Sequence, residues 1–236
     1  MDTQPLVSIV IPCFNYGKFI KEAIESCLVQ TYENIEIIVI NDRSNDHYTI
    51  DVLNRLNYPK TTVIHHLQNR GVAAARNTGI EHSTGKYILP LDADDKIAPA
   101  FIQKTSNILD SNHSVGFVST GIRHFGNRTG DYIPPPFSIK KLLYHNLYVV
   151  TSLFRKEAWQ QVGGFNEAMI DGYEDWDFWL SLVEHGWLGD CVNEVLFYYR
   201  SHHKSSKNEQ AKKKHLLIVE QIINNHPKLY GRSYNN

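Results

Sequence analysis

Short, almost continuously apolar segments alternate with helix-like segments along the chain, and this alternation constrains the fold most. The segment Ile35–Ile40 carries one charge among aliphatic residues, which is typical of a parallel strand covered on both faces. Residues 18–30 instead place Ile20, Ala23 and Cys27 three and four apart, the spacing of one helix face. Repeated strand and helix units predict an α/β protein with a Rossmann-like, mostly parallel central sheet and helices on both faces.

The predicted elements continue through the whole chain, and no internal repeat accompanies them. Residues 123–138 are rich in Gly and Pro without periodicity, so we expect a loop there. The predicted strands are Leu6–Ile11, Ile35–Ile40, Thr62–His66, Tyr87–Leu91, Val115–Thr120, Val149–Phe154 and Val195–Tyr199. The predicted helices are Lys18–Gln30, Ile50–Leu56, Val72–Glu81, Pro99–Asp110, Lys156–Val162, Asp177–His185 and Glu209–Asn225.

Length and composition favour a single domain with one substantial core, because the chain has 236 residues and 42% hydrophobic content. The net charge of −1 and the dispersed Lys and Arg residues argue against binding to nucleic acid. The three cysteines are far apart in the sequence and form no Cys-x-x-Cys pair, which suits a reducing compartment. We therefore expect a cytoplasmic protein.

No apolar stretch approaches the roughly 20 residues of a membrane-spanning helix. Any membrane contact is therefore expected to be peripheral. The run Lys212-Lys213-Lys214 is typical of a solvated helix face. Its alternative role is contact with the anionic inner face of a membrane that holds a lipid-linked acceptor.

An apolar run ends abruptly in carboxylates at residues 87–95, Tyr-Ile-Leu-Pro-Leu-Asp-Ala-Asp-Asp. Alternate side chains of an extended segment point the same way, so Asp92 and Asp94 face one side and repel each other unless a cation lies between them. Mn²⁺ and Mg²⁺ favour carboxylate oxygens and usually complete their shell with water and substrate phosphates. The motif predicts a divalent cation and a phosphorylated substrate; the alternative is a polar loop with a helix cap.

Ligands of open parallel sheets bind beyond the carboxyl ends of the strands, and polar residues follow the first four predicted strands. Each group alone is an ordinary turn or helix cap, but together they line one edge. A cleft with planar hydrogen-bonding groups at one end and a cation at the other fits a nucleoside diphosphate, with Asp42 accepting from a base N–H. The strand-end residues expected to bind it are Pro12, Phe14, Asn15, Asp42, Asn69 and Asp92.

These motifs, in this order, resemble the inverting, metal-dependent nucleotide-sugar glycosyltransferases of family 2, which have the single-domain GT-A fold. The resemblance covers roughly residues 6–206. The segments that carry it are Val7-Ser8-Ile9-Val10-Ile11-Pro12-Cys13-Phe14-Asn15, Asn41-Asp42-Arg43-Ser44, Asn69-Arg70-Gly71, Ala75-Arg76-Asn77-Thr78-Gly79, Asp92-Ala93-Asp94-Asp95, Gly163-Gly164-Phe165, Glu174-Asp175-Trp176-Asp177 and Tyr199-Arg200-Ser201-His202.

The resemblance implies roles for the matching residues. By it Asp42 contacts the base, Arg76 lies near the ribose or diphosphate, and Asp92 and Asp94 serve the ribose and the metal. His202 lies near the metal or the diphosphate. The implied cofactor is Mn²⁺ or Mg²⁺, the donor is a nucleoside-diphosphate sugar, and the acceptor is a glycan or lipid-linked saccharide in surface polysaccharide synthesis.

The resemblance also divides the single domain, residues 1–236, into functional parts. Residues 1–97 are expected to form the nucleotide-sugar-binding half and residues 98–206 the acceptor-binding, catalytic half. Residues 207–236 are expected to form a C-terminal helix. Arg200, near the end of the second half, can pair with phosphate.

Sugar transfer to a hydroxyl needs a group that takes the proton of that hydroxyl. The acidic cluster at residues 171–177 begins a predicted helix, and simple capping explains acidic residues there as well. Because the cation motif accompanies the cluster, Asp175 is the candidate base, as the resemblance also implies, and Glu174 is the second choice.

Two other functions stay open. A haloacid-dehalogenase-like phosphatase also places Asp-x-Asp after a strand, but it predicts Thr or Val at the position that Asp95 occupies. A non-catalytic module that binds nucleotide sugars or glycans would need the cleft but no base, so the Asp175→Asn variant distinguishes it from an enzyme.

Overall fold

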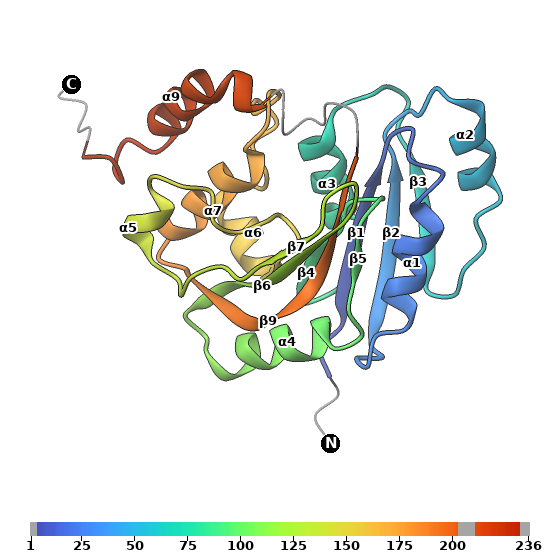
Figure 1. Cartoon of the computed structure of the whole chain (residues 1–236), viewed down its shortest axis with the longest axis horizontal. Helices are drawn as coiled ribbons and strands as arrows, with labels where there is room; N and C mark the ends of the chain where they lie inside the picture. Colours follow the sequence, from blue (N-terminus) through green and yellow to red (C-terminus); the bar gives the residue numbers. More distant parts are fainter. Residues whose placement is uncertain (1–3, 203–210, 232–236) are drawn as a thin grey trace.

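The computed structural model describes residues 4–202 and 211–231 (Figure 1). Its strands are β1 Val7–Cys13, β2 Ile35–Asn41, β3 Thr61–His65, β4 Tyr87–Pro90, β5 Lys96–Ile97, β6 Val115–Gly126, β7 Gly130–Tyr132, β8 Leu153–Arg155 and β9 Leu188–Ser201. Its helices are α1 Ile20–Leu28, α2 His47–Asn54, α3 Val72–Glu81, α4 Phe101–Ser111, α5 Ile139–Leu142, α6 Lys156–Val162, α7 Glu174–Glu184 and α9 His215–Asn225.

Within the described residues, nine strands form one sheet in the order β3-β2-β1-β4-β8-β6-β9-β5, with β7 paired to β6. The four strands from β3 to β4 are parallel, and β6 and β9 are parallel to each other. The strands β5, β7 and β8 pair antiparallel with their neighbours. The predicted α/β fold with a mostly parallel sheet is confirmed.

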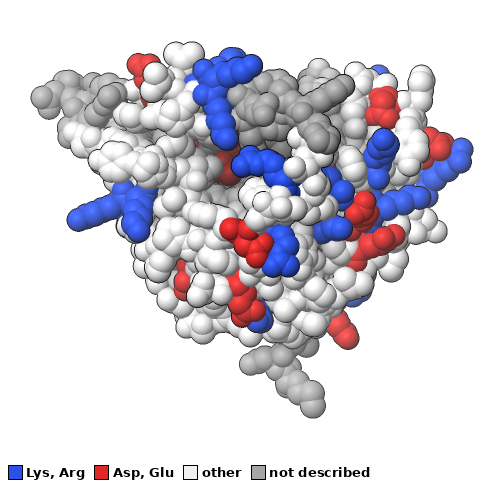
Figure 2. Space-filling view, viewed as in Figure 1, with Lys and Arg blue, Asp and Glu red and all other residues white. Residues whose placement is uncertain are grey.

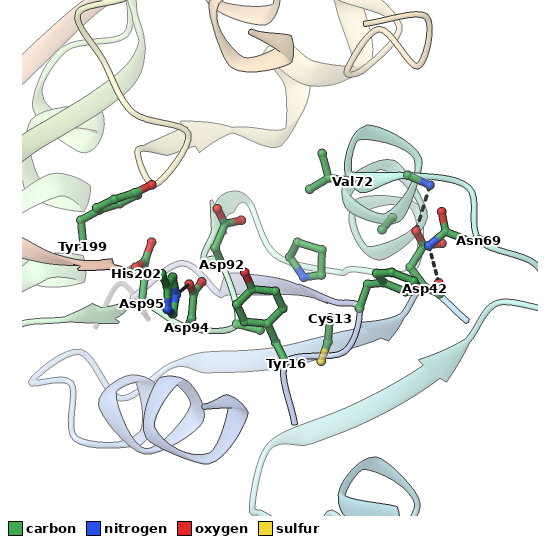
Figure 3. Close-up of a pocket in the computed structure, with 15 residues that line it drawn as sticks. Cys13, Tyr16, Asp42, Asn69, Val72, Asp92, Asp94, Asp95, Tyr199 and His202 are labelled. Carbon is green, nitrogen blue, oxygen red and sulfur yellow. Dashed lines mark hydrogen bonds and ion pairs between the residues drawn. The ribbon is translucent and has the colours of Figure 1, made fainter. Parts of the chain in front are cut away.

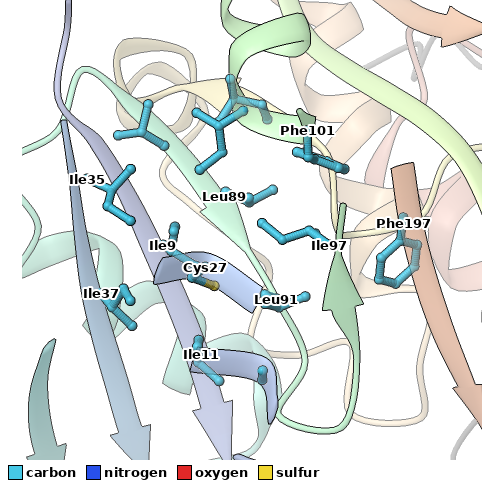
Figure 4. Close-up of a cluster of buried hydrophobic side chains, with 14 of the residues drawn as sticks. Ile9, Ile11, Cys27, Ile35, Ile37, Leu89, Leu91, Ile97, Phe101 and Phe197 are labelled. Carbon is cyan, nitrogen blue, oxygen red and sulfur yellow. The ribbon is translucent and has the colours of Figure 1, made fainter. Parts of the chain in front are cut away.

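Both faces of the sheet are covered, because successive side chains of a central strand point to opposite sides. Ile9 and Ile11 of β1 pack in a core cluster with residues of α1 and α4 (Figure 4). Val10 packs in a second cluster with residues of α3, α6 and α7. Because both faces are filled by core side chains, a ligand site is expected beyond the carboxyl ends of the strands.

Helix α3 lies close to β1 because Gly79 faces the sheet. A Cβ at this position would lie 2.3 Å from Val10 Cγ1, so a larger residue would push the helix outward. Arg76 lies on the same helix face, one turn earlier, and is 2% exposed. The close packing of α3 therefore fixes the place of a buried guanidinium.

The prediction of a loop over residues 123–138 was wrong in its first part. Strand β6 continues to Gly126, and Ile122 pairs with Tyr132 of β7 in a hairpin. The strand has no apolar periodicity of its own there; pairing with β9 along its whole length supplies its hydrogen bonds. The short strand β5, which pairs with the end of β9, was not predicted.

Several predicted element boundaries also need correction. The strand predicted over Val195–Tyr199 runs from Leu188 to Ser201, because it pairs with β6 along this whole length. The strand predicted over Val149–Phe154 is limited to Leu153–Arg155, because only these residues pair with β4 and β6. Helix α7 begins at Glu174 instead of Asp177, since Tyr173 adopts a left-handed conformation with φ of 59° before it. Helix α9 begins at His215, and the predicted start of that helix at Glu209 lies outside the described residues.

Among the described residues, none of the helices combines the length and the apolar composition needed to cross a bilayer.

Candidate active site

A cavity of about 420 Å³, the first cavity, lies beyond the carboxyl ends of β1, β2 and β4. Figure 3 shows Asp92, Asp94 and Asp95 at one end of the cavity and Asp42 and Asn69 at the other, with Tyr16 between the two groups. The sequence places these residues in separate loops, and the parallel strands bring the loops to one edge. The lining residues include five of those predicted to bind a nucleotide sugar, Pro12, Phe14, Asp42, Asn69 and Asp92.

Asp42 follows β2 and is buried at one end of the first cavity. Its carboxylate accepts hydrogen bonds from the backbone N–H groups of Arg70 and Gly71, each at 2.9 Å. It also lies 2.7 Å from His66 Nδ1, and its carbonyl accepts from the Asn69 side chain at 2.9 Å. Asp42 therefore fixes the loop between β3 and α3, in addition to forming part of the cavity wall.

Asn15 does not line the first cavity. Its Nδ2 donates to Asn45 Oδ1 at 2.7 Å, and its Oδ1 accepts from the Asn45 backbone N–H at 2.9 Å. Its own backbone N–H donates to Ser44 Oγ at 3.1 Å. Asn15 thus joins the loop after β1 to the loop after β2, which places it outside the site that the sequence predicted for it.

The acidic loop, residues 92–95, connects β4 to β5 at the other end of the first cavity. Because β5 pairs with β9, the end of β9 lies beside this loop: the Arg200 backbone N–H donates to Asp95 at 2.7 Å, and His202 Nε2 lies 2.6 Å from Asp94 Oδ2. Burial and the neighbouring carboxylate of Asp92 raise the pKa of Asp94. The loop therefore concentrates negative charge that a cation would neutralise.

Arg200 does not line the first cavity, although it was predicted to bind phosphate there. Its guanidinium is stacked between the rings of Phe19 and Phe125, with centroids 4.6 and 4.5 Å from Cζ. Its Nε donates to the Asp94 carbonyl at 2.8 Å, and its Nη2 pairs with Glu22 at 2.9 Å. Arg200 thus holds the acidic loop from behind.

The residues of the acidic loop fit a divalent cation that is shared with a phosphorylated ligand. Within the described residues, no group of three or more His, Cys, Asp or Glu side chains is arranged to hold a metal alone. Mn²⁺ and Mg²⁺ are usually held by one or two carboxylates together with substrate phosphates and water. Asp92, Asp94 and His202 all line the first cavity, and His202 Nε2 lies 2.6 Å from Asp94 Oδ2.

Arg76 connects the acidic loop to helix α7. Its Nη2 pairs with Asp92 at 2.8 Å, and its Nη1 pairs with Glu174 at 2.6 Å. Both carboxylates raise the pKa of the guanidinium against the effect of its burial, which lowers it. A single buried cation therefore links the first cavity to the residues that begin α7.

Asp175 lies in a second cavity of about 250 Å³, which shares Asp92 and Tyr199 with the first cavity. Its Oδ1 accepts from Asn146 Nδ2 at 2.9 Å and from the Trp176 backbone N–H at 2.8 Å. Burial and then the negative charge of Glu174 raise the pKa of Asp175 to about 7. A carboxylate with a pKa near neutrality can take up a proton at physiological pH.

Glu174, the second choice for a base, is already paired with Arg76. Its Oε1 accepts from the guanidinium at 2.6 Å, and the side chain is 13% exposed. The geometry therefore favours Asp175 over Glu174 as a proton acceptor.

A third cavity, of about 510 Å³, opens from the second cavity on the side of β6 and α9. The two share Asn146, Val149, Tyr173 and Tyr199. The third cavity also shares Tyr199 and His202 with the first. The three cavities therefore meet around Tyr199. Asp175 lines the second cavity, which adjoins both the first and the third.

Tyr199, Tyr16 and Asn146 are among the residues of these walls that were not predicted from the sequence. Tyr199 begins the segment Tyr199-Arg200-Ser201-His202, which carries part of the family resemblance, so the sequence did contain a signal for this residue. Tyr16 directly follows Asn15, which is the last residue predicted to bind the ligand after the first strand. Asn146 lies in a stretch without periodicity, and nothing in the local sequence indicates that it contacts Asp175 across 29 positions.

Comparison with known proteins supports the family that the sequence resembles. The model of Glycosyl transferase family 2 matches residues 8–163. A chondroitin synthase from Pasteurella multocida is 32% identical over 203 residues, covering 81% of this chain and only 21% of that protein. An uncharacterized glycosyltransferase from Haemophilus influenzae is 32% identical over 200 residues, covering 81% of this chain and 74% of that protein.

Two solved structures show the same architecture. S. aureus TarS in complex with UDP-GlcNAc has a TM-score of 0.74 at 18% identity, covering 92% of this chain and 66% of that one. A mannosyltransferase from Pyrobaculum calidifontis in complex with GDP-Man and Mn²⁺ has a TM-score of 0.75 at 20% identity, covering 99% and 70%. At these identities the likeness establishes the fold alone, and the predicted GT-A fold is confirmed. This chain belongs to glycosyl transferase family 2.

Proposed function

We propose that this chain transfers a sugar from a nucleoside-diphosphate sugar to a hydroxyl of a glycan or lipid-linked saccharide, with inversion at the anomeric carbon. The single observation that carries the proposal is Asp175: a carboxylate whose pKa is raised to about 7, in a cavity that opens into the first. The membership of this chain in glycosyl transferase family 2 supports the activity. The related solved structures, which are complexes with UDP-GlcNAc and with GDP-Man, support the donor class.

The donor would occupy the first cavity. Its base and ribose would lie between Phe14 and the loop that Asp42 fixes, and its diphosphate would lie against the acidic loop, in keeping with the lining residues of that cavity. Residues 1–97 supply most of the lining of the first cavity, which supports assigning the nucleotide-sugar-binding half to them. Asp92, Asp94 and His202 would hold Mn²⁺ or Mg²⁺, whose chemistry there is to offset the charge of the departing diphosphate.

Asp175 would act as the general base. As the acceptor oxygen forms its bond to the anomeric carbon, the bond from that carbon to the diphosphate oxygen breaks, and the hydroxyl proton passes to Asp175. One displacement of this kind inverts the anomeric centre. Asn146 holds the Asp175 carboxylate at 2.9 Å, and Arg76 couples the donor end of the site to this carboxylate through Glu174.

Surface polysaccharide synthesis at the inner face of a membrane is the proposed setting. The chondroitin synthase relative supports a role in polysaccharide synthesis. On the surface near the third cavity, Lys214 pairs with Asp171 at 2.7 Å, and Leu216 and Leu217 of α9 are 82% and 67% exposed. Exposed leucines beside lysines suit peripheral contact with an anionic bilayer.

The Asp175→Asn variant tests the proposed activity. Nucleoside diphosphate released from UDP, GDP and dTDP sugars, with Mn²⁺ and a pool of glycan acceptors, measures turnover. We expect kcat to fall about 10²- to 10⁴-fold while nucleotide affinity is unchanged. The matched control is Asp171→Asn, an exposed carboxylate in the preceding loop, which should keep full activity.

Two outcomes would favour the other functions. Nucleotide-sugar binding without any release by the wild-type protein would indicate a non-catalytic module. Hydrolysis of simple phosphate esters that is unaffected by Asp175→Asn would indicate phosphatase chemistry at Asp92.

NMR of the product tests inversion, because a retained anomeric configuration would contradict the single displacement.

A further inference from the structure

The third cavity differs from the first in its charge. Its described lining residues include no aspartate or glutamate, whereas Arg128 and Lys212 stand exposed at its rim. In the part of the chain that the structure describes, neither cation forms an ion pair with a carboxylate. Arg200, the other arginine of the cavity, is held by Glu22. In Figure 2, Lys and Arg side chains border a hollow on this face of the molecule.

The rest of the wall suits a saccharide. Tyr144 and Tyr173 present aromatic surface, against which sugar rings pack well. Burial and the neighbouring Arg128 lower the pKa of His124, so this imidazole is neutral at pH 7 and can hydrogen-bond sugar hydroxyls. The cavity therefore combines walls suited to a sugar with two rim cations that pair with no carboxylate among the described residues.

We propose that the acceptor carries an anionic group, a phosphate or a carboxylate, which Arg128 and Lys212 bind at the rim of the third cavity. This inference rests on the proposed function, because it assigns the third cavity to the acceptor. Asn146 lines both the second and third cavities and holds Asp175, so a saccharide in the third cavity extends toward the base.

Charge orients such an acceptor. Asp175 lies beyond the inner end of the third cavity, in the second cavity, and its deprotonated carboxylate repels an anion, whereas the cations at the rim attract it. The anionic group therefore stays at the rim and a hydroxyl reaches Asp175. Arginine suits both candidate groups, because its planar donors match phosphate and carboxylate oxygens.

Binding of three oligosaccharide probes of similar length to the full chain tests this inference. The probes are a neutral gluco-oligosaccharide, a glucuronic acid-containing oligosaccharide and a glycerol phosphate oligomer, each titrated by calorimetry at low and high salt. We expect at least one anionic probe to bind about tenfold tighter than the neutral one, with the advantage falling as salt rises. The tighter of the two anionic probes identifies whether carboxylate or phosphate is preferred.

The double variant Arg128→Gln/Lys212→Gln should lose that tenfold advantage, and thermal denaturation will verify its folding. Lys213→Gln, a neighbouring exposed lysine outside the cavity lining, should change nothing. Equal binding of neutral and anionic probes, no binding of either anionic probe, or full affinity in the double variant overturns the inference. Donor turnover that still depends on Asp175 would then leave the proposed function standing, whereas turnover independent of Asp175 would remove both.

Discussion

Replacing Arg76 with glutamine removes the buried cation that joins the acidic loop to α7. The guanidinium is 2% exposed and pairs with Asp92 at 2.8 Å and Glu174 at 2.6 Å. Removing one partner of a buried ion pair costs about 3–5 kcal/mol. Asp92 is 36% exposed, so water can solvate its carboxylate after the change. We therefore expect the lower end of that range, a loss of about 3 kcal/mol in the free energy of unfolding.

Thermal and urea denaturation measure this loss. For a chain of this length, about 3 kcal/mol corresponds to a fall in Tm of roughly 6–12 °C. The control is Arg70→Gln, because Arg70 and Glu167 are 3.4 Å apart and both about half exposed. Such a surface pair contributes about 0–1 kcal/mol, so the Tm of this variant should change by a few degrees at most.

Activity gives a second, independent reading of the same change. The positive charge of Arg76 lowers the pKa of Asp175 against the effects of burial and Glu174. Without that charge the pKa of Asp175 rises, so the base stays protonated to higher pH and the acid limb of the rate profile moves upward. An Arg76→Gln protein as stable as the Arg70→Gln protein, with an unmoved acid limb, would refute the coupling between the two cavities.

Three further predictions follow from the same contacts. The pKa of Asp175 is raised to about 7, and a general base works only when it is deprotonated. Wild-type kcat/KM should therefore fall about tenfold per pH unit below pH 7 and level off above it. A flat profile from pH 5 to 9 would exclude Asp175 as the base. Asp94→Asn should weaken Mn²⁺-dependent binding of nucleoside diphosphate about 10- to 100-fold, measured as thermal stabilisation with and without the ion, whereas Asp51→Asn on the exposed face of α2 should not. Gly79→Ala should lower the free energy of unfolding in urea by about 1–3 kcal/mol, because the added methyl group would lie 2.3 Å from Val10 Cγ1. If Gly79→Ala is just as destabilising in a protein that already carries Val10→Ala, this packing explanation is contradicted.

The parallel half of the fold could be read from the sequence with small boundary errors. Helix α3 begins and ends where it was predicted, at Val72 and Glu81, and the strands β1 to β4 match their predicted segments within a few residues. Apolar periodicity is a local property, so it identifies these elements without knowledge of their neighbours. The hairpin of β6 and β7 was missed because pairing with β9, not local periodicity, stabilises it.

The candidate site was predictable only as a set of loops. Strand-end positions correctly brought Asp42, Asn69 and Asp92 to one cavity, since parallel strands end at the same edge. Asn15 and Arg200 were placed in the same group, yet their side chains face other loops. A strand end fixes where a backbone arrives, whereas side-chain direction depends on partners from elsewhere in the chain.

By itself, the sequence determined the alternation of strands and helices, the family, and the acidic loop that ends β4. Only the tertiary structure decided that Arg76 pairs with Glu174 across 98 positions, that Asn146 holds Asp175, and that the walls of the third cavity carry no carboxylate among the described residues. The physical reason is range: backbone preference and apolar spacing act within a few residues, whereas charge pairing and cavity shape arise between segments that meet only after folding.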